Sequence, residues 1–418
     1  MAANPAPISG LVGEAADLAG MRECLQWFTR EKQWINDIHL QLCRVPAPTF
    51  LEQQRAEWIV AQFRNLGWDA HIDRAGNVVA TPDAHSGGPY VALTAHLDTV
   101  LAPRVKEDIG MEPDGRFRGP GISDNGAGLA ALLAIARALK VCPPVEGWHA
   151  DLVLVANVGE EGEGNLSGMR HLCKQSPLGG KIGAFLVLDG ASTDHVTNRA
   201  LGSRRFEVIF TGPGGHSWSD YGVGNPIHAL SRAISQFSDA RLSGPPKSSF
   251  NVGFIEGGAG VNAIPAVARA KVDIRSESNQ KMDDLVDSLT TAIERALEIE
   301  NQRATGGKVA VKIREIGSRP AANVAEHSPI LAYLRAVDSH LGIRSHLDCA
   351  STDANIPMSL GIPAISIGAG GQGGGAHTTQ EWFRPEGRDL GLKRILLTLC
   401  LLLRDPQFGV PSGPGVPQ

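Results

Sequence analysis

The sequence predicts an α/β protein: a three-layer catalytic domain with a largely parallel central sheet, into which a smaller α+β domain of ferredoxin-like type is inserted. Two observations lead to this prediction. Continuous apolar runs separated by helical stretches are typical of parallel strands buried on both faces. Strictly alternating segments in the middle of the chain are typical of a sheet with one solvated face. The 418 residues, 42% of them hydrophobic, are enough for two or three domains of about 150 residues each.

The expected parallel strands lie on both sides of the middle of the chain. They are the uncharged apolar runs 90–95, 152–158, 185–188 and 364–367. Between the first two runs, residues 128–140 place apolar side chains at i, i+3 and i+4, which gives a helix one stripe to cover a sheet face. We therefore expect one discontinuous catalytic domain, formed by residues 1–202 and 318–418.

The middle of the chain has a different pattern. Alternating segments at 206–210, 268–274 and 309–313 are interleaved with two amphipathic helices, expected at 226–237 and 281–299. The order of elements is β-α-β-β-α-β, that of a split-βαβ fold. We therefore expect an inserted domain over residues 203–317.

Composition excludes several classes of function. The net charge is -5, with 39 basic against 44 acidic residues, so a nucleic acid partner is not expected. The apolar run at 395–403 is far shorter than the roughly 20 residues of a membrane span. The first 20 residues contain no Lys or Arg, so we expect no secretory signal and a cytoplasmic location. Six cysteines without a C-x-x-C pair argue against a disulfide framework and against a thiolate metal site. The segment 411–418 is expected to be disordered.

Each expected parallel strand is followed by side chains that bind metals. In open α/β sheets the ligand crevice lies at the carboxyl ends of the strands, so residues far apart in the sequence meet there. One further carboxylate comes from a glycine-containing loop just ahead of the helix at 128–140. The residues of this set are His96, Asp98, Asp124, Glu160, Glu161, Asp189 and His377.

Carboxylates and imidazoles without thiolate suit one or two borderline divalent ions. Two ions about 3.5–4 Å apart need a bridging carboxylate, and Asp124 is our candidate bridge. We expect His96 and Asp189 to complete the coordination of one ion, and Glu161 and His377 to complete that of the other.

The same set contains candidates for two supporting roles. Adjacent residues at a strand end point to opposite sides, so Glu160 is expected to face the attacking water as general base while Glu161 ligates. Asp98 is expected to accept the other N–H of the His96 imidazole. A single His or Asp at a strand end is more often a turn or cap residue, so the hypothesis depends on five such ligands converging.

Five motifs in this order resemble those of the M20 co-catalytic metallopeptidases. This family includes peptidase-T-like aminopeptidases, carboxypeptidases and N-acyl amino acid deacylases. The resemblance implies a catalytic domain with two zinc ions (Co²⁺ or Mn²⁺ as alternatives), an inserted lid domain that mediates dimerisation, and hydrolysis of an amide bond. The motifs are Thr94-Ala-His-Leu-Asp-Thr-Val100, Asp124-Asn-Gly-Ala-Gly128, Gly159-Glu-Glu-Gly162, Leu188-Asp-Gly190 and Ala376-His-Thr378.

The resemblance also implies roles for residues of the inserted domain. His216, in a glycine-rich turn, is expected to stabilise the oxyanion, within its own chain or across a homodimer. Asn262 and Arg275 are expected to contact the substrate, since a guanidinium can bond both oxygens of a carboxylate. Three other charged residues share the alternating face of Arg275, so a solvated surface is an equally good interpretation of this arginine.

The motifs also depart from the commonest pattern of the family. Asp124 is followed by Asn125 and Gly126 where many relatives carry a lysine, and Gly159 replaces a frequent acidic residue. These departures leave the subfamily open. The glycine-rich loop 368–375 resembles the substrate-binding loop of the peptidase-T-like members, and its amides are expected to hold a terminal carboxylate.

Taken together, these residues predict a metallopeptidase that acts on short peptides as an aminopeptidase, using metal-activated water and Glu160 as base. Deacylation of N-acyl amino acids is the alternative, because it needs the same machinery. A non-catalytic binding relative is a third possibility, and it would lack a ligand or the base, whereas this sequence has them all.

Overall fold

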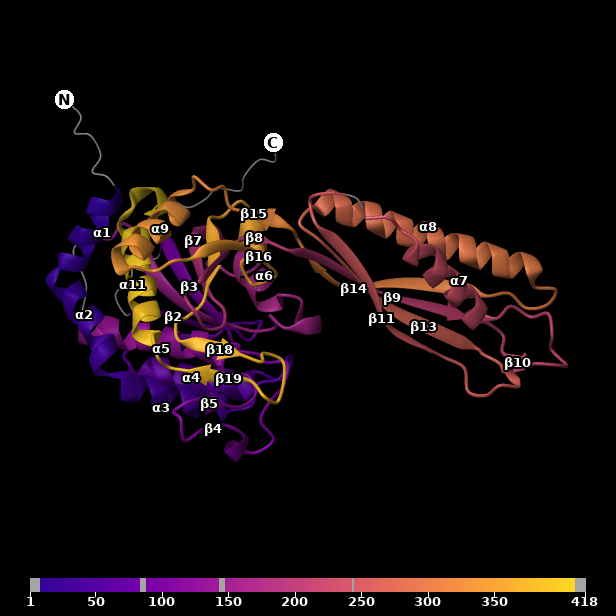
Figure 1. Cartoon of the computed structure of the whole chain (residues 1–418), viewed down its shortest axis with the longest axis horizontal. Coiled ribbons are helices and arrows are strands. Elements are labelled where there is room, and N and C mark those ends of the chain that lie inside the picture. Colours follow the sequence, from indigo (N-terminus) through magenta and orange to yellow (C-terminus); the bar gives the residue numbers. More distant parts are fainter. Residues whose placement is uncertain (1–7, 83–87, 143–146, 243, 410–418) are drawn as a thin grey trace, which may run out of the picture. The chain divides into compact units, whose positions relative to one another are not determined.

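The structure, a computed structural model, describes residues 8–82, 88–142, 147–242 and 244–409. The segment 411–418, for which we expected disorder, lies outside these residues. The chain divides into two compact units: Met1–Ala200 together with Asn323–Gln418, called here the larger unit, and Leu201–Ala322, the inserted unit (Figure 1). The domain limits predicted from the sequence differ from these by two and five residues.

The larger unit is built on a nine-stranded sheet of order β1-β2-β6-β3-β7-β17-β8-β15, with β16 paired to β8. At its centre β3 is parallel to both β6 and β7, and β7 is parallel to β17. Every residue of β3, β7 and β17 is buried, which is why these segments lack polar alternation. The predicted mixed α/β fold with a mainly parallel sheet is confirmed. The strands are β1 (Asp69–Ile72), β2 (Val78–Thr81), β3 (Tyr90–His96), β6 (Asp151–Asn157), β7 (Ile182–Leu188), β8 (His195–Ala200), β15 (Ala322–Asn323), β16 (His346–Ala350) and β17 (Ala364–Ile367).

Helix α5 (Gly126–Val141) leads directly away from the candidate site. It begins at Asn125, whose side-chain oxygen accepts a hydrogen bond from the Gly128 N–H. The sequence predicted one apolar stripe, but α5 is buried on nearly all sides because α2, α3, α4 and α11 pack around it. The other helices of this unit are α1 (Ile8–Asp17), α2 (Ala19–Arg30), α3 (Lys32–Cys43), α4 (Gln53–Asn65), α6 (Ser167–Lys174), α9 (Pro329–Leu341), α10 (Asn355–Ser359) and α11 (Arg388–Arg404).

A second, small sheet lies beside the site and was not predicted. Its order is β18-β19-β5-β4, and it brings the loop ahead of Asp124 next to the loop that carries His377. Its strands are β4 (Gly110–Met111), β5 (Phe117–Arg118), β18 (Gln372–Gly374) and β19 (Trp382–Arg384).

The inserted unit has the predicted order β-α-β-β-α-β. Its antiparallel sheet has the order β11-β13-β9-β14, and α7 and α8 cover one face around an apolar core that includes Phe206, Phe210 and Leu289. The sequence pattern did not locate β11, an edge strand whose residues are mostly exposed. The elements are β9 (Gly202–Thr211), β10 (Gly215–His216), α7 (Pro226–Ser238), β11 (Ser248–Gly257), β12 (Ala263–Ile264), β13 (Val267–Ser276), α8 (Asn279–Arg303) and β14 (Ala310–Arg319).

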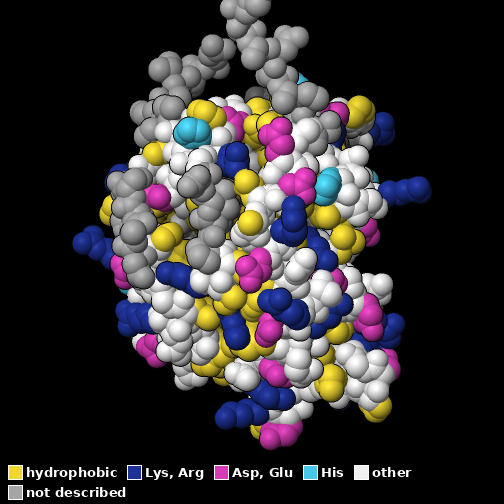
Figure 2. Space-filling model, turned by 90° about the vertical axis from the view of Figure 1, so that its left-hand side faces the viewer, with side chains coloured by type: hydrophobic (Ala, Val, Ile, Leu, Met, Phe, Trp, Pro, Cys, Tyr) yellow, Lys and Arg dark blue, Asp and Glu magenta, His cyan; other side chains and the backbone are white. Residues whose placement is uncertain are grey.

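Two surface properties follow from the described residues. None of the helices in the described ranges is both long enough and apolar enough to span a bilayer. Acidic and basic side chains are interspersed over the face shown in Figure 2. This mixture agrees with the nearly balanced charge of the sequence.

Candidate metal centre

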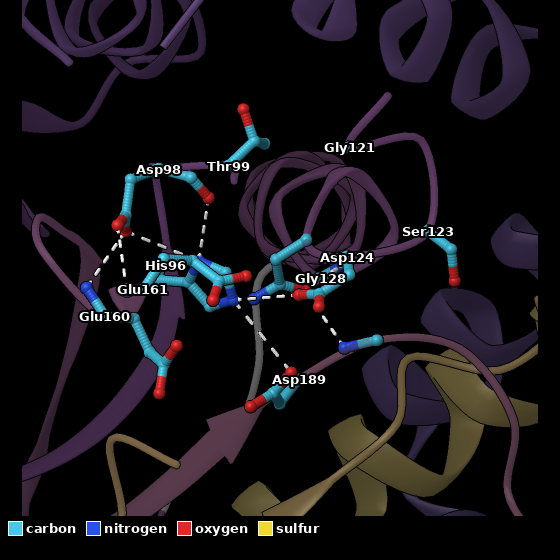
Figure 3. Close-up of polar contacts among 12 residues, drawn as sticks. His96, Asp98, Thr99, Gly121, Ser123, Asp124, Gly128, Glu160, Glu161 and Asp189 are labelled. Atoms are coloured by element: carbon cyan, nitrogen blue, oxygen red, sulfur yellow. Dashed lines mark hydrogen bonds and ion pairs between the residues drawn. The ribbon is translucent and has the colours of Figure 1, made fainter. Parts of the chain in front are cut away.

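The carboxyl ends of three neighbouring strands bring the predicted residues together (Figure 3). His96 is the last residue of β3, and Asp189 directly follows β7. Glu160 and Glu161 follow the end of β6 at Asn157. The parallel register pairs His96 with Asn157 and the preceding residue with Leu188, so the three strand ends are adjacent.

Asp124 connects the two imidazoles. Its Oδ1 lies 3.1 Å from His96 Nε2, and its Oδ2 lies 3.1 Å from His377 Nε2. His377 Nε2 is also 2.8 Å from Glu161 Oε1, and His96 Nε2 is 3.9 Å from Asp189 Oδ1. One carboxylate thus contacts both imidazoles through different oxygens, as a bridging ligand would.

Within the described ranges, three groups of side chains could each hold a metal ion, with one ligand atom per residue and all atoms within 4.8 Å of one another. His96, Asp124 and Asp189 form one group, and Asp124, Glu161 and His377 form another. These two groups share Asp124 and have the composition expected from the sequence. The third group, His96 with Glu160 and Glu161, was not predicted.

The third group corrects one step of the sequence argument. Strand alternation does not apply to Glu160 and Glu161, because β6 ends three residues earlier, at Asn157. A carboxylate oxygen of each glutamate lies within 4.8 Å of a nitrogen of His96. Both side chains are buried, with 5% and 6% of their surface exposed, so the two glutamates face the same region.

The contact between His96 and Asp98 also differs from the expected one. His96 Nδ1 lies 2.9 Å from the main-chain carbonyl oxygen of Asp98 and 3.5 Å from its carboxylate. The carboxylate instead accepts hydrogen bonds from the N–H groups of Glu160 and Glu161, at 3.0 and 2.9 Å, and from the Thr49 hydroxyl. Asp98 therefore orients the imidazole of His96 through its carbonyl and the two glutamates through its carboxylate.

Glu381 holds the Asp124 loop and was missed by the sequence analysis. Its carboxylate accepts hydrogen bonds from the N–H groups of Gly121, Ser123 and Asp124, at 2.7 to 2.8 Å. Asn125 fixes the other side of the loop, because its side-chain amide donates to the Leu188 carbonyl at the end of β7. The only signal in the sequence was a glutamate four residues after a candidate histidine ligand, and glutamates are mostly surface residues.

The carboxylates around the two imidazoles raise the pKa values of both rings. Contacts with the carboxylates of Asp124 and Asp98 outweigh burial and raise the pKa of His96 well above its usual value. The hydrogen bond to Asp124 raises the pKa of His377 to about 9. Burial favours the neutral form of Asp124, but its bonds to the two imidazoles lower its pKa below the usual value.

Two other carboxylates of the cluster bind protons more tightly than usual. Burial raises the pKa of Glu161 to about 7, and the charges of Asp124 and Glu160 add to this effect. Burial, followed by the charge of Asp124, raises the pKa of Asp189 well above its usual value. Burial and neighbouring negative charge thus both favour the protonated form of these two carboxylates.

Asp353 is a further buried carboxylate that the sequence did not reveal. It lies just ahead of α10 with 1% of its surface exposed. Its Oδ2 accepts a hydrogen bond of 2.6 Å from Asn157, whereas its Oδ1 is buried without a hydrogen-bond partner in the described part of the chain. Burial and the charge of Glu160 raise the pKa of Asp353 to about 7.

This donor set fits divalent cations. Two imidazoles face six carboxylates (Asp98, Asp124, Glu160, Glu161, Asp189 and Asp353), and buried charge of one sign is costly unless it is compensated. Imidazole nitrogens and carboxylate oxygens are ligands of borderline divalent ions. Two cations sharing Asp124 would compensate most of the excess charge.

The remaining predicted residues belong to the inserted unit. His216 lies on β10, and its Nδ1 accepts a hydrogen bond from the Trp218 N–H. Asn262 is beside it, because its carbonyl accepts a hydrogen bond from the N–H of the residue after His216. Arg275 lies elsewhere in the unit. It is eight residues from Val267, the first residue of β13, which corresponds to about 26 Å along the strand at 3.3 Å per residue.

The environment of Arg275 is a solvated surface. Its Nε donates a hydrogen bond of 2.7 Å to the Asp273 carboxylate, and 42% of its side chain is exposed. Within the inserted unit, the structure thus brings His216 and Asn262 together and leaves Arg275 apart from them.

The glycine-rich loop 368–375 is more engaged than expected. The N–H groups of Ala369 and Gly370 donate to the carbonyls of Gly190 and Ser192, and residues 372–374 form β18, which pairs with β19. Several amides that were expected to hold a substrate carboxylate therefore form hydrogen bonds within the protein instead.

Comparison with known proteins relates this geometry to a family. Residues 199–301 match the M20 peptidase dimerisation domain, and residues 77–216 match peptidase family M28. A succinyl-diaminopimelate desuccinylase of Corynebacterium glutamicum is 26% identical over 339 residues, which cover 79% of this chain and 86% of the relative. The cytosol non-specific dipeptidase of Escherichia coli is 26% identical over 364 residues, covering 79% and 70% of the two chains.

Solved structures share the fold over almost the whole chain. A tripeptidase from Staphylococcus aureus superposes with a TM-score of 0.72 at 21% identity, covering 90% of this chain and 99% of the other. A dinuclear metal-binding peptidase of the M20 family from Bacillus subtilis has a TM-score of 0.63 at 14% identity, covering 90% and 99%. In sequence and in fold, the chain is similar to members of the M20 peptidase family.

These similarities confirm the resemblance drawn from the five motifs. The protein is a hydrolase of the metallopeptidase class, and the match to the dimerisation domain of these peptidases covers most of its inserted unit. The family includes dinuclear metal-binding peptidases, and the ligand groups around Asp124 are the candidate site in this protein. The roles of the individual residues, the identity of the metal and the cytoplasmic location stay predictions.

Proposed function

We propose that this protein is an aminopeptidase that hydrolyses short peptides at a site with two divalent cations. Zinc is the expected metal, with cobalt or manganese as alternatives. The observation that carries the proposal is the position of Asp124, whose two oxygens each lie 3.1 Å from a different imidazole. A carboxylate in this position is what a two-metal site requires.

Five residues would hold the cations. His96 and Asp189 would hold one cation, Glu161 and His377 would hold the other, and Asp124 would contact both. Bound there, the cations would lower the pKa of a water toward about 7 and would polarise the scissile carbonyl. Glu381 and Asn125 keep Asp124 in place through the hydrogen bonds of its loop.

Glu160 acts as the general base in this proposal. Its carboxylate takes a proton from the attacking water and delivers it to the nitrogen of the leaving amine. Asp98 orients the two sides of the site, because its carbonyl contacts His96 Nδ1 and its carboxylate accepts the N–H groups of Glu160 and Glu161. Fixed orientation of the base lowers the entropic cost of the reaction.

The inserted unit supplies the remaining groups. His216 stabilises the oxyanion, a contribution of roughly 2–4 kcal/mol for one donor, and Asn262 beside it contacts the substrate. Arg275 was assigned a substrate contact from the resemblance, and its bond to Asp273 favours a surface role instead. We propose that the protein is a homodimer through this unit, since residues 199–301 match the dimerisation domain.

Deacylation of N-acyl amino acids is the second candidate. It is favoured by the similarity to a desuccinylase over 86% of that relative's length. The same water, base and cations would act on the amide of an acylated amine. A non-catalytic binding role is the third candidate and has no such observation in its favour.

The test is hydrolysis of dipeptides, tripeptides and N-acetyl amino acids by the purified protein. We expect turnover of short peptides, its loss on chelation and its recovery with zinc, cobalt or manganese. Turnover of N-acetyl amino acids alone would make the protein a deacylase. Metal-loaded protein that hydrolyses none of these amides would contradict the proposal and favour a binding role.

A further inference from the structure

Exposed apolar side chains gather on two turns beside the candidate metal centre. In the described part of the larger unit, nine large apolar side chains are exposed, and four of them belong to these turns. Single exposed apolar residues are common on proteins, whereas a group of them usually marks a contact surface. We call this group the apolar rim; it consists of Phe50 (66% exposed), Leu51 (69%), Val100 (44%) and Leu101 (37%).

Hydrogen bonds fix the first turn to the site on both sides of its apolar pair. Thr49, just before Phe50, donates to the Asp98 carboxylate at 3.0 Å. Glu52, just after Leu51, accepts a hydrogen bond of 3.2 Å from the Gly159 N–H, which directly precedes the proposed base. The apolar pair is thus anchored between Asp98 and the glutamate pair.

The second turn is joined to the first. The Thr99 N–H donates to the Ala47 carbonyl at 3.0 Å, and Pro48 and Thr99 form a parallel bridge. Val100 follows directly, two residues after Asp98. Both parts of the apolar rim therefore rest on the same structure that orients His96 and the glutamates.

Phe50 also has a backbone conformation that is costly for its residue type. Its φ is +74°, in the left-handed region that bulky side chains rarely adopt. Such residues persist only where the surrounding structure holds them, and they gather at functional sites. An exposed aromatic residue in this conformation contributes little to the core, so stability of the fold does not explain it.

We propose that the apolar rim is a specificity surface for substrates with an apolar side chain, such as Leu, Phe or Met, next to the scissile amide. This inference rests on the proposed hydrolysis of short peptides and names the substrate class of that site. The rim buries part of the substrate side chain on binding, and the hydrophobic effect then favours apolar over glycine-containing peptides. Its contribution is to selectivity, because none of its side chains takes part in proton transfer.

The experiment compares kcat/KM for matched peptides in which one residue next to the scissile bond is Gly, Ala, Leu or Phe. The unaltered protein is expected to prefer Leu or Phe over Gly. In Phe50→Ala and Leu51→Ala this preference is expected to fall about tenfold, the scale of a few lost methylene contacts, with little change for the Gly peptide. Phe50→Leu is expected to restore most of the preference.

Two further variants separate specificity from folding. Phe50→Gly removes the ring and suits the positive φ, so it is expected to be folded as stably as the unaltered protein and still to lose the preference. Val141→Ala removes an apolar side chain that is 50% exposed at the far end of α5, about 22 Å from its first residue at 1.5 Å per residue. This matched control is expected to leave the preference unchanged.

Three results would overturn the inference. One is equal loss of activity toward Gly and Leu peptides in the rim variants, which would indicate a general effect on the site. Another is a change of oligomeric state in sedimentation with selectivity intact, which would make the rim an interface between copies of the chain. The third is absence of hydrolysis by the unaltered, metal-loaded protein, which would remove the proposed function and this inference with it.

Discussion

Charged residues are arranged differently at the candidate metal centre and on the sheet of the inserted unit. On that sheet, Arg204 pairs with Glu315 and Arg275 pairs with Asp273, and these side chains are 25% to 42% exposed. At the metal centre, buried carboxylates outnumber the imidazoles, and the pKa values of Glu161 and Asp353 are raised to about 7. Exposed ion pairs balance opposite charges at the surface. A buried cluster in which carboxylates outnumber imidazoles instead indicates a site that binds cations or performs chemistry.

The largest expected effect is that of Glu160→Gln. If Glu160 is the base, glutamine cannot accept the proton, and kcat is expected to fall about 10²- to 10⁴-fold while the metal content stays unchanged. Steady-state kinetics with metal analysis of the same sample measures both. Because Glu160 also forms a group with His96 and Glu161, a parallel loss of metal would instead identify it as a ligand.

The next largest effect is expected for Glu381→Gln, which keeps size and removes charge. The carboxylate accepts three N–H groups of the Asp124 loop, and an amide can offer only its oxygen. Zinc affinity is expected to fall about 10- to 100-fold, as for other residues that orient ligands. Competition with a chromogenic chelator measures it. The exposed Glu386→Gln, five residues later, should bind zinc normally, and equal affinity in both variants would disprove the role of Glu381.

A third prediction concerns pH and the buried Asp353. Burial raises its pKa from 3.8 to about 7, so the folded protein binds this proton more tightly than the unfolded chain does. The contribution of the protonated form to stability is lost as pH rises from about 4 to about 7. Asp353→Asn cannot ionise, so the free energy of unfolding of the variant relative to the unaltered protein is expected to increase between pH 5 and 7 and then level off.

Asp338→Asn is the matched control for that measurement. Asp338 is also buried, but both of its oxygens accept hydrogen bonds from Arg394, at 2.6 and 2.7 Å. Breaking this buried pair is expected to cost about 3–5 kcal/mol. Chemical denaturation across pH measures the free energy of unfolding of both variants and of the unaltered protein. If the difference between Asp353→Asn and the unaltered protein does not change with pH, the charge of Asp353 is compensated in the folded protein.

The smallest effect is expected for Arg275→Ala on the solvated sheet. The pair with Asp273 is partly exposed, so the free energy of unfolding should change by about 1 kcal/mol or less. The KM for short peptides is expected to change less than about threefold, because Arg275 lies apart from His216 and Asn262. A tenfold rise in KM would restore the substrate contact that the resemblance implied.

Most of the fold could be predicted because its signals are local. The runs at 90–95 and 185–188 are apolar throughout because β3 and β7 are buried on both faces. Edge strand β11 was not located, because an edge strand has few buried positions and so a weak pattern. The small sheet was missed for a related reason: its strands have two or three residues, too few to show a periodicity, and its central pairing joins β5 to β19, over 250 positions apart.

The candidate ligands could be predicted because each follows a recognisable strand or glycine loop. What the sequence could not supply is the identity of hydrogen-bond partners. Whether His96 contacts the carbonyl or the carboxylate of Asp98 depends on a turn of two residues. Glu381 and Asp353 lie in segments with no metal-site pattern, and only the folded chain brings them to the Asp124 loop and to Asn157.

The most direct test of the account is the number of zinc ions bound per chain after reconstitution and dialysis, measured by mass spectrometry of the metal. We expect about two for the unaltered protein and fewer than one for Asp124→Asn, because the carboxylate that contacts both imidazoles would serve both sites. A value of one in the unaltered protein, or two in the variant, would contradict the shared carboxylate.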